Sequence, residues 1–301
     1  MSDAAATRVP SGAEVPVGRR DGRGYWATVA VRLSRDPLTL VFGFVLLLIV
    51  ASAVFAPWIA PTEPDTTNVL KRLTPMGTPG YLLGADELGR DMLSRLLYGG
   101  RLSLLMGIVP VIGALVIGGG LGIAAGFIGG RLNMFVMRTM DVFYAFPSVL
   151  LAIGLVGAFG SGIVNLLISI TVILSPPIAR VAESVTTQVR TYDFVEAARA
   201  SGAPTFAIIR IHVLANVLGP ILTFATSLVS VSIIISAGLS FLGFGVQPPI
   251  PEWGLMLSTL RKSIWINPYV CALPGLMIFI TSMCFNLLSD GLRNAMDVRL
   301  G

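Results

Sequence analysis

LSLLMGIVPVIGALVIGGGLGIAAGFI, residues 102–128, is the stretch that decides what kind of protein this chain is. It runs for 27 residues without a charged side chain. An α-helix rises about 1.5 Å per residue, so this stretch is long enough to cross the ~30 Å hydrocarbon core of a bilayer. We therefore interpret it as a membrane-spanning helix.

Five further apolar stretches flank it, and the composition of the whole chain agrees with them. Only 12% of the residues are charged and 54% are hydrophobic, whereas a soluble domain carries roughly 25% charge. The sequence predicts an all-α polytopic membrane protein with six transmembrane helices. The other five predicted spans cover residues 38–60, 140–159, 163–181, 217–239 and 269–288.

Small residues in the second span allow two interpretations. Gly118, Gly119, Gly120, Gly122 and Gly126 all lie in its second half. Small side chains let helix backbones approach closely, which favours tight packing against a neighbouring helix. A hinge that moves during transport is the alternative.

The distribution of basic residues predicts the orientation. Residues 1–36 form a basic leader that we expect to be flexible, and residues 37–301 form the six-span domain. The first span exceeds the ~7–15 residues of a signal-peptide core, so we interpret it as a retained anchor. With the leader in the cytoplasm, the inner segments carry 14 of the 21 Lys and Arg residues. The positive-inside rule then predicts that both termini are cytoplasmic.

The longest inner loop, residues 182–215, contains a predicted short helix. Asp193 is suited to cap its start, and Glu196 follows three residues later as in a capping box. Gly202 suits a left-handed C-terminal cap, and Pro204 prevents continuation. We expect a helix over 194–201, followed by a second one that leads into the fifth span. Composition alone favours an ordinary cytosolic connector for this loop.

Two outer segments are also distinctive. Residues 83–95, LGADELGRDMLSR, precede the second span, and residues 245–254, GVQPPIPEWG, lie between the fifth and sixth. The carboxylates of the first segment lie close to Arg90 and Arg95, which favours ion pairs and helix caps over a cation site. Trp253 is expected to anchor the second segment at the membrane interface. A docking surface for a substrate-binding protein is the alternative.

Several classes of function find little support. A subunit that hydrolyses ATP would need a phosphate-binding loop of the form G-x-x-x-x-G-K-[ST]. Lys71 and Lys262 are the only lysines, and neither lies in such a motif. The middles of the predicted spans contain no charged residue, which argues against a proton-coupled secondary transporter, although sodium coupling needs no charge. With one histidine, His212, an intramembrane enzyme is not indicated. Cys271 and Cys284 would be ~20 Å apart on one helix, too far for a disulfide.

The 182–215 loop resembles the EAA loop of ABC importer permeases. The resemblance rests on Glu196-Ala197-Ala198, Gly202 and the later His212-Val213-Leu214, although Ala215 stands where the family usually has proline. The segments 83–95 and 245–254 resemble the dipeptide, oligopeptide and nickel branch, and most closely its C-type permease subunit. Together these segments make the resemblance cover about residues 38–299.

This resemblance implies a type I ABC importer permease fold and a non-catalytic subunit that translocates peptides. Nickel or another small solute is the alternative cargo, and an ion-coupled secondary transporter is the alternative from another class. The implied partners are a homologous B-type permease, two cytosolic ATPases, an extracytoplasmic substrate-binding protein and the lipid bilayer of a bacterial cytoplasmic membrane, with no nucleic acid. ATP and Mg would be used by the ATPases, and no cofactor or metal is expected on this chain.

The resemblance also assigns site residues. The implied ATPase-coupling residues are Asp193, Glu196, Ala197, Ala198, Arg199 and Gly202. The outer-loop residues implied in binding-protein docking or gating are Asp86, Gly89, Arg90, Asp91, Gln247, Pro248, Pro249 and Trp253.

Overall fold

The hydrogen-bonding requirement of the backbone explains why this chain is helical. A lipid-exposed segment can satisfy its amide groups only within a helix or a closed barrel. The computed structural model describes residues 25–296. Helices joined by turns and loops make up this part of the chain, and it contains no β-strand.

Five long helices are apolar enough to cross a membrane, and four of them contain a predicted span completely. The five are α2 (Pro37–Val54), α4 (Met92–Ala114) continued by η2 (Leu115–Gly119) and α5 (Gly120–Ile128), α8 (Ile163–Val189), α10 (Thr205–Ile208) continued by η3 (Ile209–Val213) and α11 (Leu214–Phe241), and α13 (Pro268–Met296). The first ends at Val54, whereas the span predicted over 38–60 continues into the separate short helix Ala56–Ile59. The second begins ten residues before the predicted start because the Asp91 side chain caps it, accepting from the Ser94 amide. The fourth continues through Pro176 and Pro177.

The third predicted span, residues 140–159, is not one continuous helix. It is divided between α6 (Gly130–Tyr144) and α7 (Ser148–Phe159), which meet at an angle of 90°. Pro147 has no amide hydrogen, and the helix ends before it at Tyr144. If the bent pair is counted as one span, the described chain has six.

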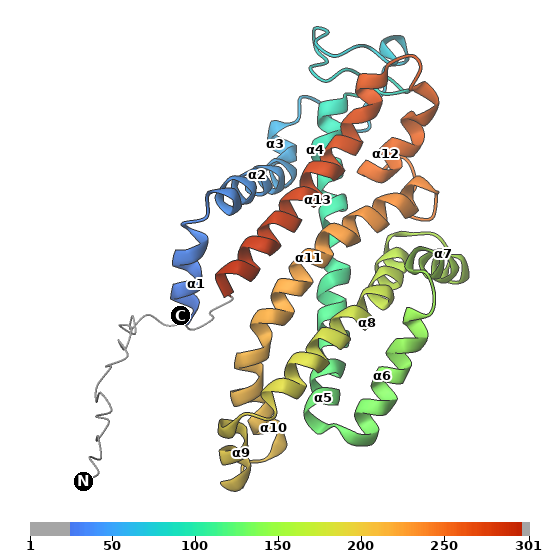
Figure 1. Cartoon of the computed structure of the whole chain (residues 1–301). Helices are drawn as coiled ribbons and strands as arrows, with labels where there is room; N and C mark the ends of the chain where they lie inside the picture. Colours follow the sequence, from blue (N-terminus) through green and yellow to red (C-terminus); the bar gives the residue numbers. More distant parts are fainter. Residues whose placement is uncertain (1–24, 297–301) are drawn as a thin grey trace, which may run out of the picture.

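The spans pack around α11, which contacts α13, α4 and α8 (Figure 1). On one side of the bundle α2 packs against α13 and α4, and on the other side α6 and α7 pack against α8. Part of the predicted leader is helical, since α1 (Tyr25–Leu33) forms and packs against α13. Residues 1–24 lie outside the described part of the chain.

The loops gather at two opposite ends of the bundle (Figure 1). The inner end, as named here, carries α9 (Asp193–Ala200) and α10. The outer end carries residues 60–91 with η1 (Val69–Lys71), and also α12 (Trp253–Leu260) with η4 (Arg261–Ser263). The short helix α3 (Ala56–Ile59) follows α2 after Phe55 and precedes the loop of residues 60–91.

Candidate functional site

The predicted short helix of the inner loop is present as α9, with one difference at its start. Tyr192 is the N-cap residue, and Asp193 is the first helical residue, with no side-chain capping bond at this end. The capping pair predicted for Asp193 and Glu196 is therefore wrong. Both carboxylates still lie in the first turn, where the positive end of the helix dipole favours them.

The end of α9 follows local turn chemistry. Gly202 has φ +78°, as expected for a left-handed cap. Its amide donates to the Arg199 carbonyl at 3.0 Å, and the Ala203 amide donates to the Ala198 carbonyl at 3.2 Å. These two bonds make a Schellman motif, which turns the chain sharply toward α10.

Three side chains seat α9 against the bundle. Val195 is fully buried in the main hydrophobic core. The Arg199 guanidinium lies 5.1 Å from the ring centre of Phe127, at the end of α5. The Phe194 ring lies 6.3 Å from His212 in η3. α9 therefore contacts the inner ends of two spans: α5 through Phe127, and η3, which continues into α11, through His212. A force applied to α9 reaches α5 and α11.

The opposite face of α9 is free. Asp193, Glu196, Ala197 and Ala200 are exposed, and the Glu196 side chain has no bonding partner among the described residues. On the adjacent α10, Phe206 is also exposed. An exposed surface of small, acidic and aromatic side chains at the foot of the bundle is suited to contact another protein.

At the outer end, the predicted ion pairs and cap of residues 83–95 form one buried cluster. Asp86 Oδ2 accepts from Arg90 Nε at 2.6 Å and lies 3.3 Å from Arg95 Nε. Asp91 caps α4, and the backbone at Gly89 lies so close to Asn68 that no side chain fits between them. Asp86, Arg90 and Asp91 are buried, so they hold the loop together and present no surface for docking.

The second outer segment is anchored inside the protein, not at the membrane interface. The Trp253 side chain is only 1% exposed, and its Nε1 donates to the Leu96 carbonyl at 3.0 Å. The predicted interfacial role of Trp253 is therefore wrong. The ring is accommodated because Gly99 and Gly100 of α4 leave room for it. Gln247, Pro248 and Pro249 lie on the exposed tip of the same loop.

A buried carboxylate stands beside this tryptophan. Glu252 caps α12 by accepting from the amides of Gly254 and Leu255, both at 2.8 Å. Ser103 Oγ of α4 donates to the same carboxylate at 3.1 Å. Burial raises the pKa of Glu252, while the two amide bonds act in the opposite direction. This residue ties α12 to α4, and sequence reasoning did not single it out.

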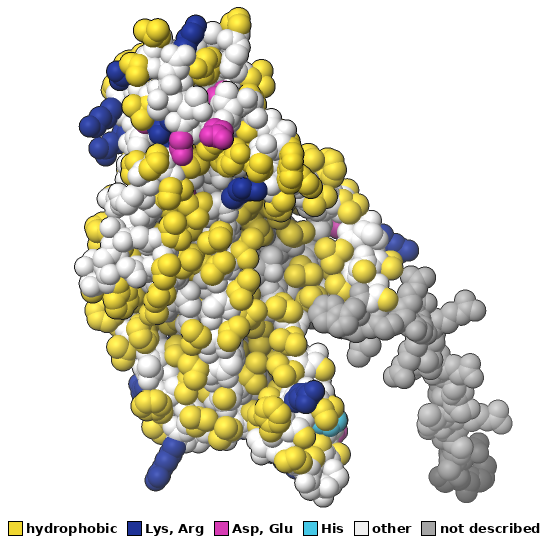
Figure 2. All heavy atoms as spheres, turned by 180° about the vertical axis from the view of Figure 1, so that it is seen from behind, with side chains coloured by type: hydrophobic (Ala, Val, Ile, Leu, Met, Phe, Trp, Pro, Cys, Tyr) yellow, Lys and Arg dark blue, Asp and Glu magenta, His cyan; other side chains and the backbone are white. Residues whose placement is uncertain are grey.

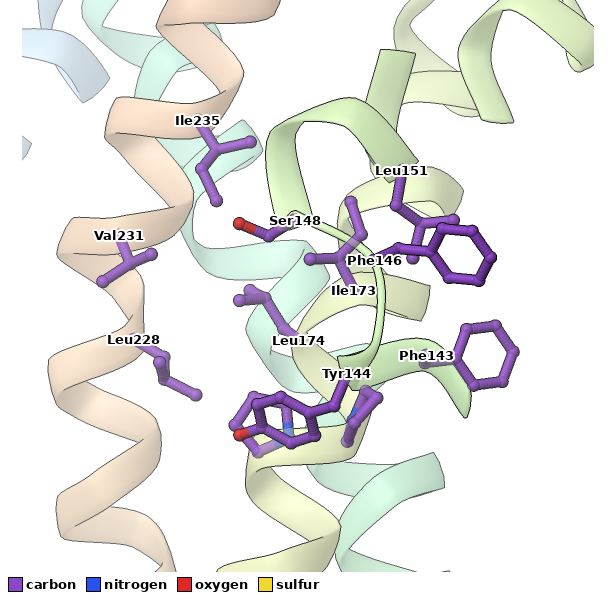
Figure 3. Close-up of a pocket in the computed structure, with 12 residues that line it drawn as sticks. Phe143, Tyr144, Phe146, Ser148, Leu151, Ile173, Leu174, Leu228, Val231 and Ile235 are labelled. Atoms are coloured by element: carbon purple, nitrogen blue, oxygen red, sulfur yellow. The ribbon is translucent and has the colours of Figure 1, made fainter. Parts of the chain in front are cut away.

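An apolar pocket of about 170 Å³ lies where α6 breaks from α7. Figure 3 shows Leu228 and Val231 of α11 facing Tyr144 and Leu174 across it. At its inner edge, Arg180 pairs with Asp141 and lies 5.2 Å from the Tyr144 ring centre. No charged side chain lines the pocket itself.

Comparison with known proteins shows the family to which this chain belongs. Residues 118–301 match the family described as the binding-protein-dependent transport system inner membrane component. Residues 24–75 match the N-terminal transmembrane domain of oligopeptide transport permease C. The chain belongs to this permease family. It is a C-type permease, a non-catalytic multi-pass subunit of an ABC importer of the bacterial inner membrane.

The permease has relatives of nearly its own length. It is 38% identical to the glutathione transport system permease protein GsiD of Pectobacterium atrosepticum, over 96% of each chain. It is 43% identical to the di/tripeptide transport system permease protein DppC of Pseudomonas aeruginosa, over 85% of this chain and 86% of that one.

A solved structure confirms the fold. A chain of the MetNI methionine ABC transporter, in inward-facing conformations, matches with a TM-score of 0.56 and 21% identity. The match covers 68% of the permease and 97% of that chain. It supports the predicted type I importer permease fold, with the spans arranged as described above.

The permease has functional features that sequence reasoning missed, and most are contacts between distant segments. Phe127 receives both the Arg199 guanidinium over its ring and the Arg190 Nη1 donor on its carbonyl, at 3.3 Å. Ser103 and Glu252, which are hydrogen-bonded, are 149 residues apart in the sequence. Only the Glu252-Trp253-Gly254 order, a capping residue before a helix, could have indicated the α12 start from sequence.

Proposed function

We propose that this permease carries peptides into the cytoplasm, with a B-type permease beside it and two ATPases bound at the inner end. Both termini and the 182–215 loop lie in the cytoplasm in this proposal. ATP and Mg are used by the ATPases. A soluble extracytoplasmic binding protein delivers the cargo, and the exposed tip at Gln247, Pro248 and Pro249 is a candidate contact for it.

The observation that carries the coupling part of the proposal is the two-sided character of α9. One side is fixed, by Arg199 to the end of α5 and by Phe194 to η3, which continues into α11, and Val195 is buried in the core. The other side is free. Glu196 lies on the free side without a bonding partner among the described residues. Ala198 is partly buried and packs against the core, so an ATPase that binds Glu196 and Ala197 would move the spans through the contacts of the fixed side.

The cargo is inferred from the relatives and from the pocket. The named relatives include permeases for di/tripeptides and for glutathione, itself a small peptide. A pocket without charged lining suits cargo whose side chains vary in chemistry. Nickel or another small solute is the second candidate, which the family resemblance leaves open.

Two variants test the coupling. Glu196→Ala removes a contact to the ATPase, and Gly202→Val forces a β-branched residue to φ +78°, which costs ~1 kcal/mol or more and redirects α9. Gly77→Val is the matched control, because Gly77 has φ +80° with open space around it at the outer end. We expect both inner variants to reach the membrane with the partner permease, and to lose the ATPases or hydrolyse ATP without uptake.

The readouts are co-purification of the ATPases and ATP-driven uptake into proteoliposomes that contain the whole complex. Labelled dipeptide, tripeptide, glutathione and Ni²⁺ are offered in parallel with the binding protein. Uptake within about twofold of wild type for Glu196→Ala and Gly202→Val would show that α9 is only a connector. Uptake by this chain alone on an ion gradient would contradict the ABC assignment.

A further inference from the structure

A group of exposed apolar and basic side chains lies at the outer end, away from the residues that the sequence indicated for docking. Leu70 is 95% exposed, Trp265 is 94% exposed and Ile266 is 70% exposed. Lys71 and Lys262 are exposed beside them along the chain. We call these five residues the outer patch. Apolar side chains this exposed are costly unless lipid or another protein covers them.

The two segments of the outer patch are joined by a defined contact. Asn267 is buried, and its Nδ2 donates to the carbonyls of Leu73 at 3.3 Å and Thr74 at 3.5 Å. Leu73 has φ +52° and is the one non-glycine residue in the described chain with positive φ. Because Asn267 bonds to the carbonyl of this strained residue, the loop before α4 and the turn before α13 form one prearranged surface.

Lipid is a poor explanation for the first half of this surface. Residues 60–91 contain one short helical turn, η1, and otherwise irregular backbone. Irregular backbone is not stable where it faces hydrocarbon, because its amide groups would lack partners. Leu70 therefore faces water in the isolated chain, and a protein is the natural cover for it.

The charge of the outer patch indicates what kind of protein that is. Lys71 and Lys262 are the only lysines of the chain, and the side chains of both lack a partner among the described residues. Figure 2 shows basic, acidic and hydrophobic side chains over this end of the molecule. Basic residues are disfavoured in the outer loops of membrane proteins. Two unpaired lysines there fit a partner that supplies acidic side chains.

We propose that the outer patch is the docking surface for the soluble binding protein, and that an acidic rim of that protein meets Lys71 and Lys262. This inference rests on the proposed function, which provides such a partner. Leu70, Trp265 and Ile266 form the apolar centre of the contact, and the lysines steer the approach. Asp86, Arg90, Asp91 and Trp253 are buried, so they do not touch the partner.

The test uses the complete complex in nanodiscs and its own binding protein. The binding-protein Kd is measured by interferometry at low and high salt, together with the stimulation of ATP hydrolysis. We expect the double variant Lys71→Glu/Lys262→Glu to raise the Kd about tenfold or more and to flatten its salt dependence. Trp265→Ala should raise the Kd about tenfold without changing the salt dependence. Basal ATP hydrolysis should not change.

Arg131→Glu is the control, since it reverses an exposed charge at the opposite end of the molecule and should leave the Kd unchanged. A Kd within about twofold of wild type for both patch variants would overturn the docking surface while leaving the proposed function intact. Quenching of Trp265 fluorescence by brominated lipid, or cross-linking of Trp265→Cys to the partner permease, would overturn it in favour of those neighbours. A wild-type complex that binds no soluble protein would overturn both proposals.

Discussion

Gly122 lies so close to Ala179 that a Cβ atom on Gly122 would stand 2.2 Å from the Ala179 carbonyl oxygen. One turn earlier Gly118 faces the Ser175 carbonyl in the same way, at 2.3 Å, and one turn later Gly126 faces Glu183 at 2.6 Å. The second and fourth spans therefore touch backbone to backbone along this stripe. For these three of the five glycines, the structure confirms close packing.

Gly122→Ala should destabilise the permease, because the added methyl group collides with a backbone atom that cannot rotate away. Overpacking of this kind costs about 1–3 kcal/mol. Gly120→Ala is the matched control, since a Cβ there meets nothing within 4 Å. Thermal unfolding in detergent should give a lower Tm for Gly122→Ala only. Equal midpoints for the two variants would show that α5 and α8 separate readily.

Asp86→Ala should be among the most damaging changes at the outer end. It removes the carboxylate that pairs with Arg90 and Arg95, and leaves two buried guanidinium groups without their main partner. Breaking a buried pair costs about 3–5 kcal/mol. We expect early proteolysis within residues 60–91. Asp65→Ala is the comparison, because Asp65 is half-exposed and contacts Arg95 at 3.5 Å, a contact worth at most about 1 kcal/mol.

Glu252 should make stability depend on pH. Burial raises its pKa above the usual 4.5, so the folded protein holds this proton more tightly than the unfolded chain. Stability from this group is full below the unfolded pKa and is lost as pH rises toward the folded pKa. The free energy of unfolding of wild type should therefore fall relative to Glu252→Gln as pH rises from about 4.5. A constant difference from about pH 4 to about pH 8 would contradict this.

The orientation can be tested with single cysteines. Ser184 lies near the inner end of α8 and Thr66 lies in the outer loop, and both are exposed. The native Cys271 and Cys284 are buried and free, so wild type serves as the unlabelled background. An impermeant maleimide should label Thr66→Cys in intact cells, and Ser184→Cys only after permeabilisation. Labelling of Ser184→Cys from outside would invert the proposed topology.

The sequence predicted the elements that depend on local chemistry. Long uncharged stretches form helices because lipid offers the backbone no other partner, and four of the six predicted spans lie inside continuous helices. Gly202 ends α9 because glycine alone adopts positive φ without strain, and the turn then needs no distant contact. The side of the membrane at which each loop lies stays a prediction from the basic residues.

Tertiary structure decided the features that depend on what a segment meets. Pro147 was visible in the sequence, but the 90° angle between α6 and α7, which both pack on α8, was not. Tryptophan is a typical anchor at the membrane interface, yet Trp253 is buried because Gly99 and Gly100 of another span leave space for its ring. Hydropathy along one segment determines that it enters the membrane. The shape and hydrogen bonds of its neighbours determine which of its side chains are buried and which stay free to bind a partner.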